Sequence, residues 1–281
     1  MENPTIWNQL LVWPIVNVLM ALYKGFEYLH IPGPLGFAVI GLTIIIRALL
    51  YPLMNAQMKS AKKMSALKPH LDTISEKHKG DKQALQQAQL ALYKEHGVNP
   101  AAGCLPLLIQ MPVLIALYNV FYQVLNNGNV QKVVAELNHV AYASWLHIDK
   151  LDLTFLGVNL GLKPGQWQTH GWWLLSIPVI TGALQWYQSK LMLPQTPADP
   201  ATQLKQTSSK KQSKAIVKKT DDAVAEKKPE DTAMEMQKQM AMITPIMFGY
   251  FALQFPLGLA LYWNVFGLFG IMQQLKINKE K

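Results

Sequence analysis

Long stretches without charged side chains run through this sequence and predict membrane-spanning helices. Residues 239–275 form 37 such positions, residues 96–131 form 36 and residues 164–189 form 26. A fourth apolar stretch, residues 28–58, contains one charged residue, Arg47. A spanning helix needs about 20 predominantly apolar residues, and soluble cores rarely supply such runs. We therefore expect an all-α integral membrane protein.

The apolar runs divide into five predicted transmembrane helices, at residues 35–54, 105–125, 172–192, 240–255 and 258–275. The run 239–275 is too long for one helix, and Pro256 and Gly258 near its middle predict a tight hairpin of two short spans. These spans are about 24 and 27 Å long at 1.5 Å per residue, against a hydrocarbon core of about 30 Å. Such short spans are expected to thin the bilayer locally.

The N-terminal residues 1–34 contain a further apolar segment, Ile6–Tyr23, which is interrupted by polar residues and Pro14. This mixture favours an amphipathic helix lying in the membrane interface, and a spanning helix remains the alternative. The segment lacks the positive region of a secretory signal, so we expect it to stay in the mature protein.

The distribution of lysines predicts the orientation in the membrane. Residues 55–104, residues 193–238 and the tail after residue 275 hold 20 lysines, against four in residues 1–34 and 126–171. Cytoplasmic loops carry the excess of Lys and Arg in membrane proteins. We therefore expect the N-terminus and the loop 126–171 outside, and the C-terminal tail 276–281 in the cytoplasm.

The cytoplasmic segment 55–104 is predicted to be a helical hairpin. Apolar residues recur at helical spacing, first at Leu67, Leu71 and Ile74 and then at Leu85, Ala88 and Leu92, with a turn signal at Lys79–Asp81 between the two sets. The candidate docking residues are the lysines of this hairpin: Lys59, Lys62, Lys63, Lys77, Lys79 and Lys82. The sequence supports two interpretations equally. The hairpin is either a docking arm for the ribosome, a targeting receptor or anionic lipid, or a solvated helical pair whose lysines only follow the distribution of positive charge.

The second cytoplasmic segment, residues 193–239, is predicted to be disordered. Residues 204–220 carry six lysines and no acid, whereas residues 221–235 carry six acids and two lysines. Low hydrophobicity with separated charge blocks is typical of disordered segments. A solvated tether is favoured over a weak RNA or lipid contact.

Polar residues recur on single faces of the predicted spans. Helical geometry aligns Thr43 with Arg47 and Tyr51, and aligns Thr181 with Gln185 and Gln188. The other spans contribute polar or amphipathic residues at Gln110, Asn119, Tyr262, Trp263 and Asn264. Polar groups in lipid face a protein or water-filled interior, or bond across helices. Four spans with such faces indicate a hydrophilic groove.

Among these residues, Arg47 has the highest free-energy cost of insertion into a bilayer. A guanidinium at the bilayer centre costs roughly 2.5–3.5 kcal/mol on insertion scales. Its side chain either snorkels toward the cytoplasmic end or lies in a hydrated groove. Every Asp and Glu falls outside the predicted spans, so water, carbonyl groups or a visiting anion must satisfy the charge. This pattern favours a groove whose positive charge is available to a substrate.

The sequence lacks the motifs of the common enzyme and metal classes. It contains no His-Glu-x-x-His, no Gly-x-Ser-x-Gly and no phosphate loop, and its seven histidines have no metal-ligand spacing. The single cysteine, Cys104, excludes an internal disulfide. We therefore expect no enzymatic activity, no cofactor and no metal site.

Three motifs together resemble the YidC/Oxa1/Alb3 family of membrane protein insertases. They are "IIIRALLYPLMNAQ" at residues 44–57, "NPAAGCLPLLIQMPVLIALY" at 99–118 and "FPLGLALYWNVFGLFGIMQQ" at 255–274. The resemblance extends from Ile6 to about Leu275. It implies a bacterial cytoplasmic (inner) membrane protein with five spans around a hydrophilic groove, an outer interfacial amphipathic helix and a cytoplasmic helical hairpin. We expect a core without the large folded domain that precedes it in Gram-negative relatives, and without a lipoprotein signal.

The resemblance further implies an insertase mechanism without ATP. The polar outer segment of a client would enter a groove that is closed toward the outside, while its apolar helix passes sideways into lipid. The groove residues would be Arg47, Thr43, Gln110, Gln185, Gln188, Tyr262 and Trp263. Arg47 would attract acidic tails. Expected partners are single-span and small nascent membrane proteins, the ribosome, a targeting receptor or the Sec translocon, and the lipid bilayer. No small-molecule substrate is expected, and a monomer suffices.

Two other functions remain open at this point. A chaperone or scaffold of the same fold would assist client folding without translocation. A small-solute channel or transporter is the third class, although a transporter should show paired repeats with broken helices, and the sequence shows no such repeat.

Overall fold

The structure is a computed structural model that describes residues 4–78, 80–98, 105–127, 130–192 and 232–279. Most of this part of the chain is helical, which confirms the expected class. The helices are α1 (Trp13–Tyr28), α2 (Pro34–Ala66), α3 (Lys68–Lys77), α4 (Lys82–Glu95), α5 (Leu105–Asn127), α6 (Val130–His139), α7 (Trp167–His170), α8 (Ser176–Met192), α10 (Thr232–Gln254) and α11 (Leu257–Lys279). Shorter elements are the π-helix η1 (Asn8–Val12), the 3-10 helices η3 (Ser144–Leu146), η4 (Pro164–Gln166) and η5 (Trp172–Leu175), and the antiparallel strands β1 (Thr154–Phe155) and β2 (Val158–Asn159).

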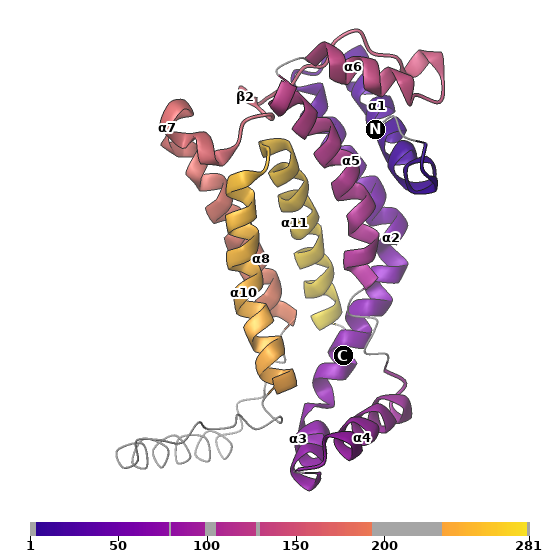
Figure 1. Cartoon of the computed structure of the whole chain (residues 1–281), viewed down its shortest axis with the longest axis vertical. Coiled ribbons are helices and arrows are strands. Elements are labelled where there is room, and N and C mark those ends of the chain that lie inside the picture. The colour runs from indigo at the N-terminus through magenta and orange to yellow at the C-terminus, as the bar shows by residue number, and fades with distance from the viewer. Residues whose placement is uncertain (1–3, 79, 99–104, 128–129, 193–231, 280–281) are drawn as a thin grey trace.

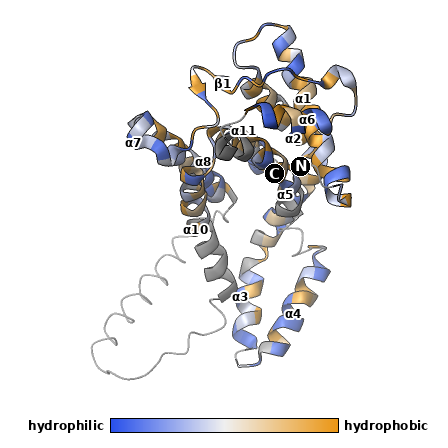
Figure 2. Ribbon diagram, turned by 45° about the horizontal axis from the view of Figure 1, so that its top comes forward, coloured by the Kyte–Doolittle hydropathy of each residue, from blue (hydrophilic) through white to orange (hydrophobic). Residues whose placement is uncertain are grey.

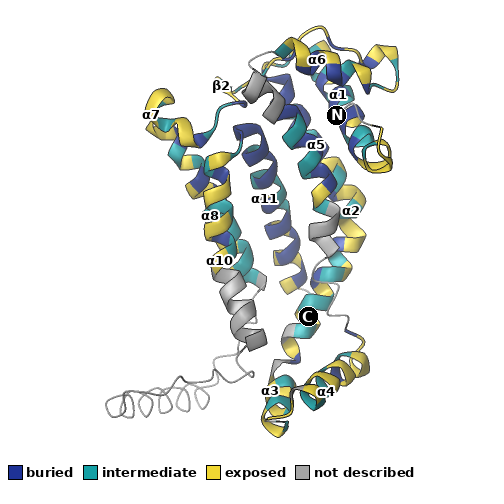
Figure 3. Cartoon of the chain, in the orientation of Figure 1, coloured by how far each residue is buried: buried dark blue, intermediate teal, exposed yellow. Residues whose placement is uncertain are grey.

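Helix α11 is the central helix of the bundle (Figure 1). It packs against α2, α5 and α8, while α1 packs against α2 and α10 packs against α8. Much of α11 is buried, whereas the α3–α4 pair is largely exposed (Figure 3). Because its neighbours lie on different sides, α11 brings side chains of α2, α5 and α8 to one helix.

Large apolar side chains cover the outside of the bundle. Leu49 of α2, Val179 of α8 and Ile246 of α10 are 76%, 69% and 74% exposed. Two described stretches, Asn8–Tyr28 and Pro34–Met64, are long and apolar enough to cross a membrane, and only 33% of the apolar window of each is buried within the protein. Many hydrophilic residues lie on the α3–α4 pair (Figure 2). Exposed apolar surface of this extent favours lipid rather than water around the bundle, as the sequence predicts.

Residues 130–166, here called the α6 cap, fold over the end of the bundle opposite the α3–α4 pair (Figure 1). Asn17 of α1 holds the cap in place. Its Nδ2 donates to the Val140 carbonyl at 2.9 Å, and its Oδ1 accepts from the Tyr142 amide at 2.7 Å. The hydroxyl of Tyr23, one and a half turns further along α1, accepts from the Asp152 amide at 2.9 Å. Helix α1 therefore packs one face against protein.

The α6 cap also completes the first turn of α11. The amides of Leu257 and Gly258 donate to the carbonyls of Leu162 and Leu160 at 2.8 and 2.9 Å. These bonds satisfy donors that a helix N-terminus leaves without an intrahelical partner. Gly258 additionally admits the ring of Phe121 from α5, because a Cβ at this position would overlap ring atoms.

Two helices extend beyond the spans predicted from the sequence. Helix α2 continues from the expected end at Met54 to Ala66, and α10 begins at Thr232, inside the segment 193–239 that was expected to be disordered. Both extensions are rich in Ala, Met, Gln and Lys, which have high helix propensity. The rest of that segment, residues 193–231, lies outside the described residues, as does Cys104.

The helices α3 and α4 form the predicted hairpin pair. Leu67, Leu92 and Val98 are buried together, and Leu71 and Ile74 pack against them. These are residues of the apolar stripes expected from helical spacing, with Val98 added where the chain leaves α4. The cluster is small, so the pair is a satellite of the main core rather than part of it.

Candidate functional site

Arg47, the only arginine of the chain, lies in α2 with a side chain that is 6% exposed. Its guanidinium packs on α11. Nη2 donates a hydrogen bond to the Phe266 carbonyl, and the guanidinium carbon lies 3.5 Å from the centroid of the Phe266 ring. Nε is buried and has no hydrogen-bond partner among the described residues. The side chain therefore turns into the bundle, where one carbonyl and one aromatic face stabilise part of its charge.

Two glycines of α11 allow polar side chains of α2 and α8 to reach the helix backbone. A Cβ on Gly270 would lie 2.9 Å from Nη2 of Arg47 and 2.8 Å from Nε2 of Gln188. A Cβ on Gly267 would lie 3.8 Å from Oε1 of Gln188 and 4.0 Å from Nε2 of Gln185. Any larger residue at 270 would displace one of its two neighbours. The structure thus brings Arg47, Gln185 and Gln188 together on α11.

Tyr262 connects this site to α5. Its side chain is fully buried, and its hydroxyl accepts a hydrogen bond from Nε2 of Gln110 at 2.6 Å. Its ring centroid lies 5.8 Å from that of Phe266. A continuous column of side chains therefore runs from Gln110 through Tyr262 and Phe266 to Arg47, crossing from α5 to α2.

The two remaining candidate groove residues have other contacts. Thr43 is buried, and its hydroxyl donates to the Val39 carbonyl one turn earlier in α2 at 2.6 Å. Trp263 packs among aromatic rings, 5.4 Å from Phe248 and 5.5 Å from Phe255 between centroids. Thr43 bonds its own helix and Trp263 belongs to an aromatic cluster, so both lie apart from the polar contacts around Arg47.

Phe266 and Gly270 are site residues that the sequence analysis did not single out. They follow Tyr262 at intervals of four residues, which places all three on one face of α11. The periodicity that aligned the polar residues of the other spans would have identified this face. Their side chains are apolar or absent, so the pattern of polar residues in the spans does not identify them.

The candidate docking lysines lie on the α3–α4 pair and on the end of α2 that leads to it. Exposed side chains are those of Lys59, Lys62, Lys63 and Lys77. Lys62 also donates to the Ile277 carbonyl near the end of α11 at 3.0 Å, so it links two helices. Lys82 is the first residue of α4, and Lys79 lies outside the described residues.

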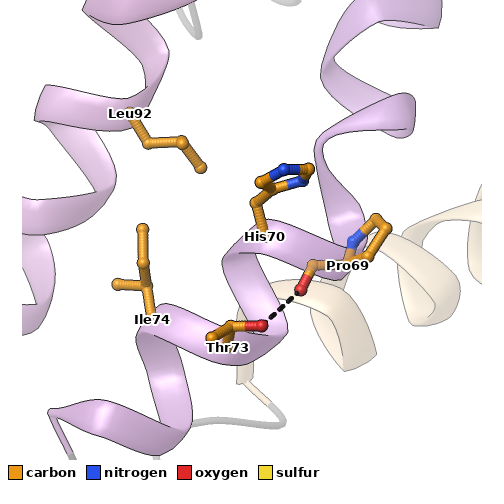
Figure 4. Close-up of a pocket in the computed structure, with 5 residues that line it drawn as sticks. All are labelled: Pro69, His70, Thr73, Ile74 and Leu92. Atoms are coloured by element: carbon orange, nitrogen blue, oxygen red, sulfur yellow. Dashed lines mark hydrogen bonds between the residues drawn. The ribbon is translucent and has the colours of Figure 1, made fainter.

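A pocket of about 290 Å³ opens between α3 and α4 (Figure 4). Its lining residues are Pro69, His70, Thr73, Ile74 and Leu92. The Thr73 hydroxyl donates to the Pro69 carbonyl at 3.0 Å, which leaves mainly apolar contact for an occupant. Across the described parts of the chain, no group of three or more His, Cys, Asp or Glu side chains is placed to hold a metal ion.

Comparison with known proteins identifies the family. A family model described as 60Kd inner membrane protein matches residues 25–281. Curated proteins named membrane protein insertase YidC from Pelagibacter ubique, Helicobacter pylori and Tolumonas auensis are 32%, 31% and 31% identical over 88%, 90% and 94% of this chain. The alignments cover 36%, 34% and 36% of those proteins, so the chain spans about a third of their length. The chain belongs to the 60Kd inner membrane protein family, which is the YidC/Oxa1/Alb3 family that its three motifs resemble.

Proposed function

We propose that this chain is a membrane protein insertase that moves short polar segments of nascent membrane proteins outward and releases their apolar helices sideways into the bilayer. The observation that carries the proposal is Arg47, buried where α2 meets α11 with an Nε that has no hydrogen-bond partner among the described residues. Burying a guanidinium in a membrane protein is costly, and its bond to the Phe266 carbonyl, the one that the described residues provide, uses one of five donors. Such a group is suited to binding a carboxylate of a passing client.

The proposal includes the topology expected from the sequence. Five spans, at residues 35–54, 105–125, 172–192, 240–255 and 258–275, cross a bacterial cytoplasmic membrane with the N-terminus outside. In this orientation the α6 cap closes the outer end of the bundle, and the α3–α4 pair lies in the cytoplasm. Its lysines then face the ribosome, a targeting receptor or the Sec translocon.

The groove of the proposed insertase is formed by Arg47, Gln110, Gln185, Gln188 and Tyr262, with Thr43 and Trp263 in its walls. Polar groups along the slot shorten the dry distance that a client tail crosses. Burial of the client's apolar helix supplies the free energy at about 25 cal/mol per Å², so no ATP is required. A membrane potential adds roughly 2.3 kcal/mol per negative charge moved outward per 100 mV.

Reconstitution of the purified chain in liposomes tests this function. A single-span client with an acidic outer tail is added without nucleotide, and protease protection of the tail is measured. We expect wild type to protect the tail, and Arg47→Ala to protect it much less while its level in the membrane stays normal. Equal protection in empty liposomes would refute an insertase. Integration of the client without protection of its tail would instead indicate a chaperone that does not translocate.

A further inference from the structure

The turn of the β1–β2 hairpin holds an apolar residue where a polar one is favoured. Phe155 pairs with Val158, so Leu156 and Gly157 form a two-residue turn between the strands. Both turn residues have positive φ, 50° and 80°, as a type I′ turn requires. Asn-Gly and Asp-Gly are the favoured sequences there, and a bulky side chain in the left-handed region is strained. Such strain persists where a contact of the side chain compensates for it.

The residues that the structure describes do not supply this contact. Leu156 is 79% exposed, and a Cβ on Gly157 would meet no described atom within 4 Å. Residues 153–162, which include the hairpin, hold no charged side chain. In Figure 2 the strand β1 is coloured as hydrophobic and stands clear of the helices. The turn is thus an apolar projection that the described protein leaves uncovered.

The base of the hairpin is fixed at the first turn of α2. A Cβ on Gly36 would overlap the ring of Phe155, so the absent side chain makes room for this ring. The Phe155 ring also lies edge to face against Phe37, with 5.2 Å between the centroids. The stretch Pro34–Met64 is long and apolar enough to cross a membrane. The hairpin therefore lies at the depth where a spanning helix meets the membrane surface.

The surroundings of this end of α2 favour lipid as the missing contact. Tyr28 and Leu29, at the end of α1 just before the link to α2, are 83% and 63% exposed. Tyr is enriched where a bilayer meets water, and apolar side chains insert between the headgroups and the acyl chains. A specific protein partner buries roughly 800 Å² on each side, far more than a two-residue turn offers. Lipid requires no such area.

We propose that the β1–β2 hairpin is a membrane anchor of the α6 cap, with Leu156 inserted into the lipid leaflet at the cap end of the bundle. Burial of the Leu156 side chain among acyl chains offsets the strain of its left-handed backbone. The anchor holds the cap at the level of the first turn of α2. This role uses only the membrane location of the protein, so it is independent of client insertion.

Fluorescence quenching in liposomes tests the anchor on the full chain. A single cysteine replaces Leu156 in a Cys104→Ser background and carries a nitrobenzoxadiazole label. Lipids with a nitroxide on the acyl chain quench a label inside the bilayer, and iodide on both sides of the membrane quenches a label in water. We expect quenching mainly by the nitroxide lipids, with emission shifted to shorter wavelengths.

The matched control is the same label on Asp149→Cys, because Asp149 is an exposed residue of the α6 cap within a polar stretch. This label should be quenched mainly by iodide. Quenching of the label at position 156 mainly by iodide would overturn the proposal. Equal behaviour of the two labels would overturn it as well, because the hairpin would then have no contact that distinguishes it from the rest of the cap.

A second variant tests whether Leu156 itself holds the hairpin in lipid. The label is moved to Thr154→Cys, an exposed position of β1, and Leu156→Asn is added. Asn-Gly is the sequence that the turn favours, so the hairpin stays folded. We expect quenching by the nitroxide lipids to fall and quenching by iodide to rise, because the apolar side chain is lost. Unchanged quenching by both would show that Leu156 is not the anchor.

Discussion

Replacing Arg47 with methionine separates a structural from a functional role for the buried guanidinium. The substitution removes the hydrogen bond to the Phe266 carbonyl and the contact with its ring. The hydrogen bond contributes about 1.5–3 kcal/mol. The contact with the ring contributes up to about 2 kcal/mol. The substitution also removes a desolvation cost of several kcal/mol for a charge that is 6% exposed and whose Nε has no partner in the described part of the chain. Methionine is unbranched, fills similar space and needs no partner.

The lost contacts and the removed desolvation cost are of similar size, so measured replacements of buried charges decide the expected sign, and we expect Arg47→Met to be at least as stable as wild type. Replacing a buried ion pair by apolar residues of similar volume is neutral or stabilises a protein by about 1–4 kcal/mol. We therefore expect a Tm that is unchanged or raised by several degrees. Protection of an acidic client tail should fall by at least about tenfold, because the anion loses its partner.

The assay is thermal unfolding in detergent, followed by helical circular dichroism, together with the liposome protection assay on the same preparation. A fall in Tm of several degrees would show that Arg47 is kept for stability. Unchanged protection of acidic tails would show that its charge does not serve the clients. Either result would contradict a functional role for the buried charge. Unchanged or raised stability with a loss of activity is the pattern expected of a functional site.

Three further substitutions test the account at other points. Arg47→Lys should retain most protection of acidic tails, because a charge rather than a bidentate geometry is needed; a loss as large as that of Arg47→Ala would contradict this. Asn17→Ala leaves two backbone groups of the α6 cap without their side-chain partner, and it should lower stability by about 2–4 kcal/mol, measured as a fall in Tm. Gly258→Ala pushes against the ring of Phe121 and should lower Tm by several degrees, whereas Gly25→Ala, with nothing within 4 Å of the added carbon, should not.

The parts of the fold that depend on local pattern were predictable from the sequence. Stripes at helical spacing placed Leu67, Leu71, Ile74 and Leu92 at the contact between α3 and α4, and the structure packs them there. The apolar runs located the long helices, and the break near Pro256 separates α10 from α11. The predicted end of α2 is too early and the predicted start of α10 is too late. Helix-forming polar residues extend each helix beyond its apolar part.

The parts that depend on contacts between distant segments were not predictable. The sequence indicated only a connecting loop at residues 126–171, because the α6 cap is held by bonds such as those of Asn17 to backbone more than a hundred residues away. The hydrogen-bond partner of Arg47 was not predictable from the sequence either. A carbonyl was among the expected groups, but the rotation of α11 that presents Phe266 and Gly270 to α2 follows from packing of the whole bundle.

Water access at position 47 distinguishes a hydrated groove from an arginine that is sealed inside the bundle or faces lipid. A single cysteine replaces Arg47 in a Cys104→Ser background, and a membrane-impermeant maleimide is applied from each side in turn. We expect labelling from the cytoplasmic side alone, because in the proposed topology the groove opens to the cytoplasm and the α6 cap lies at its outer end. Labelling from both sides would contradict the account by showing a continuous pore, and absence of labelling from either side would contradict it by showing that position 47 never meets water.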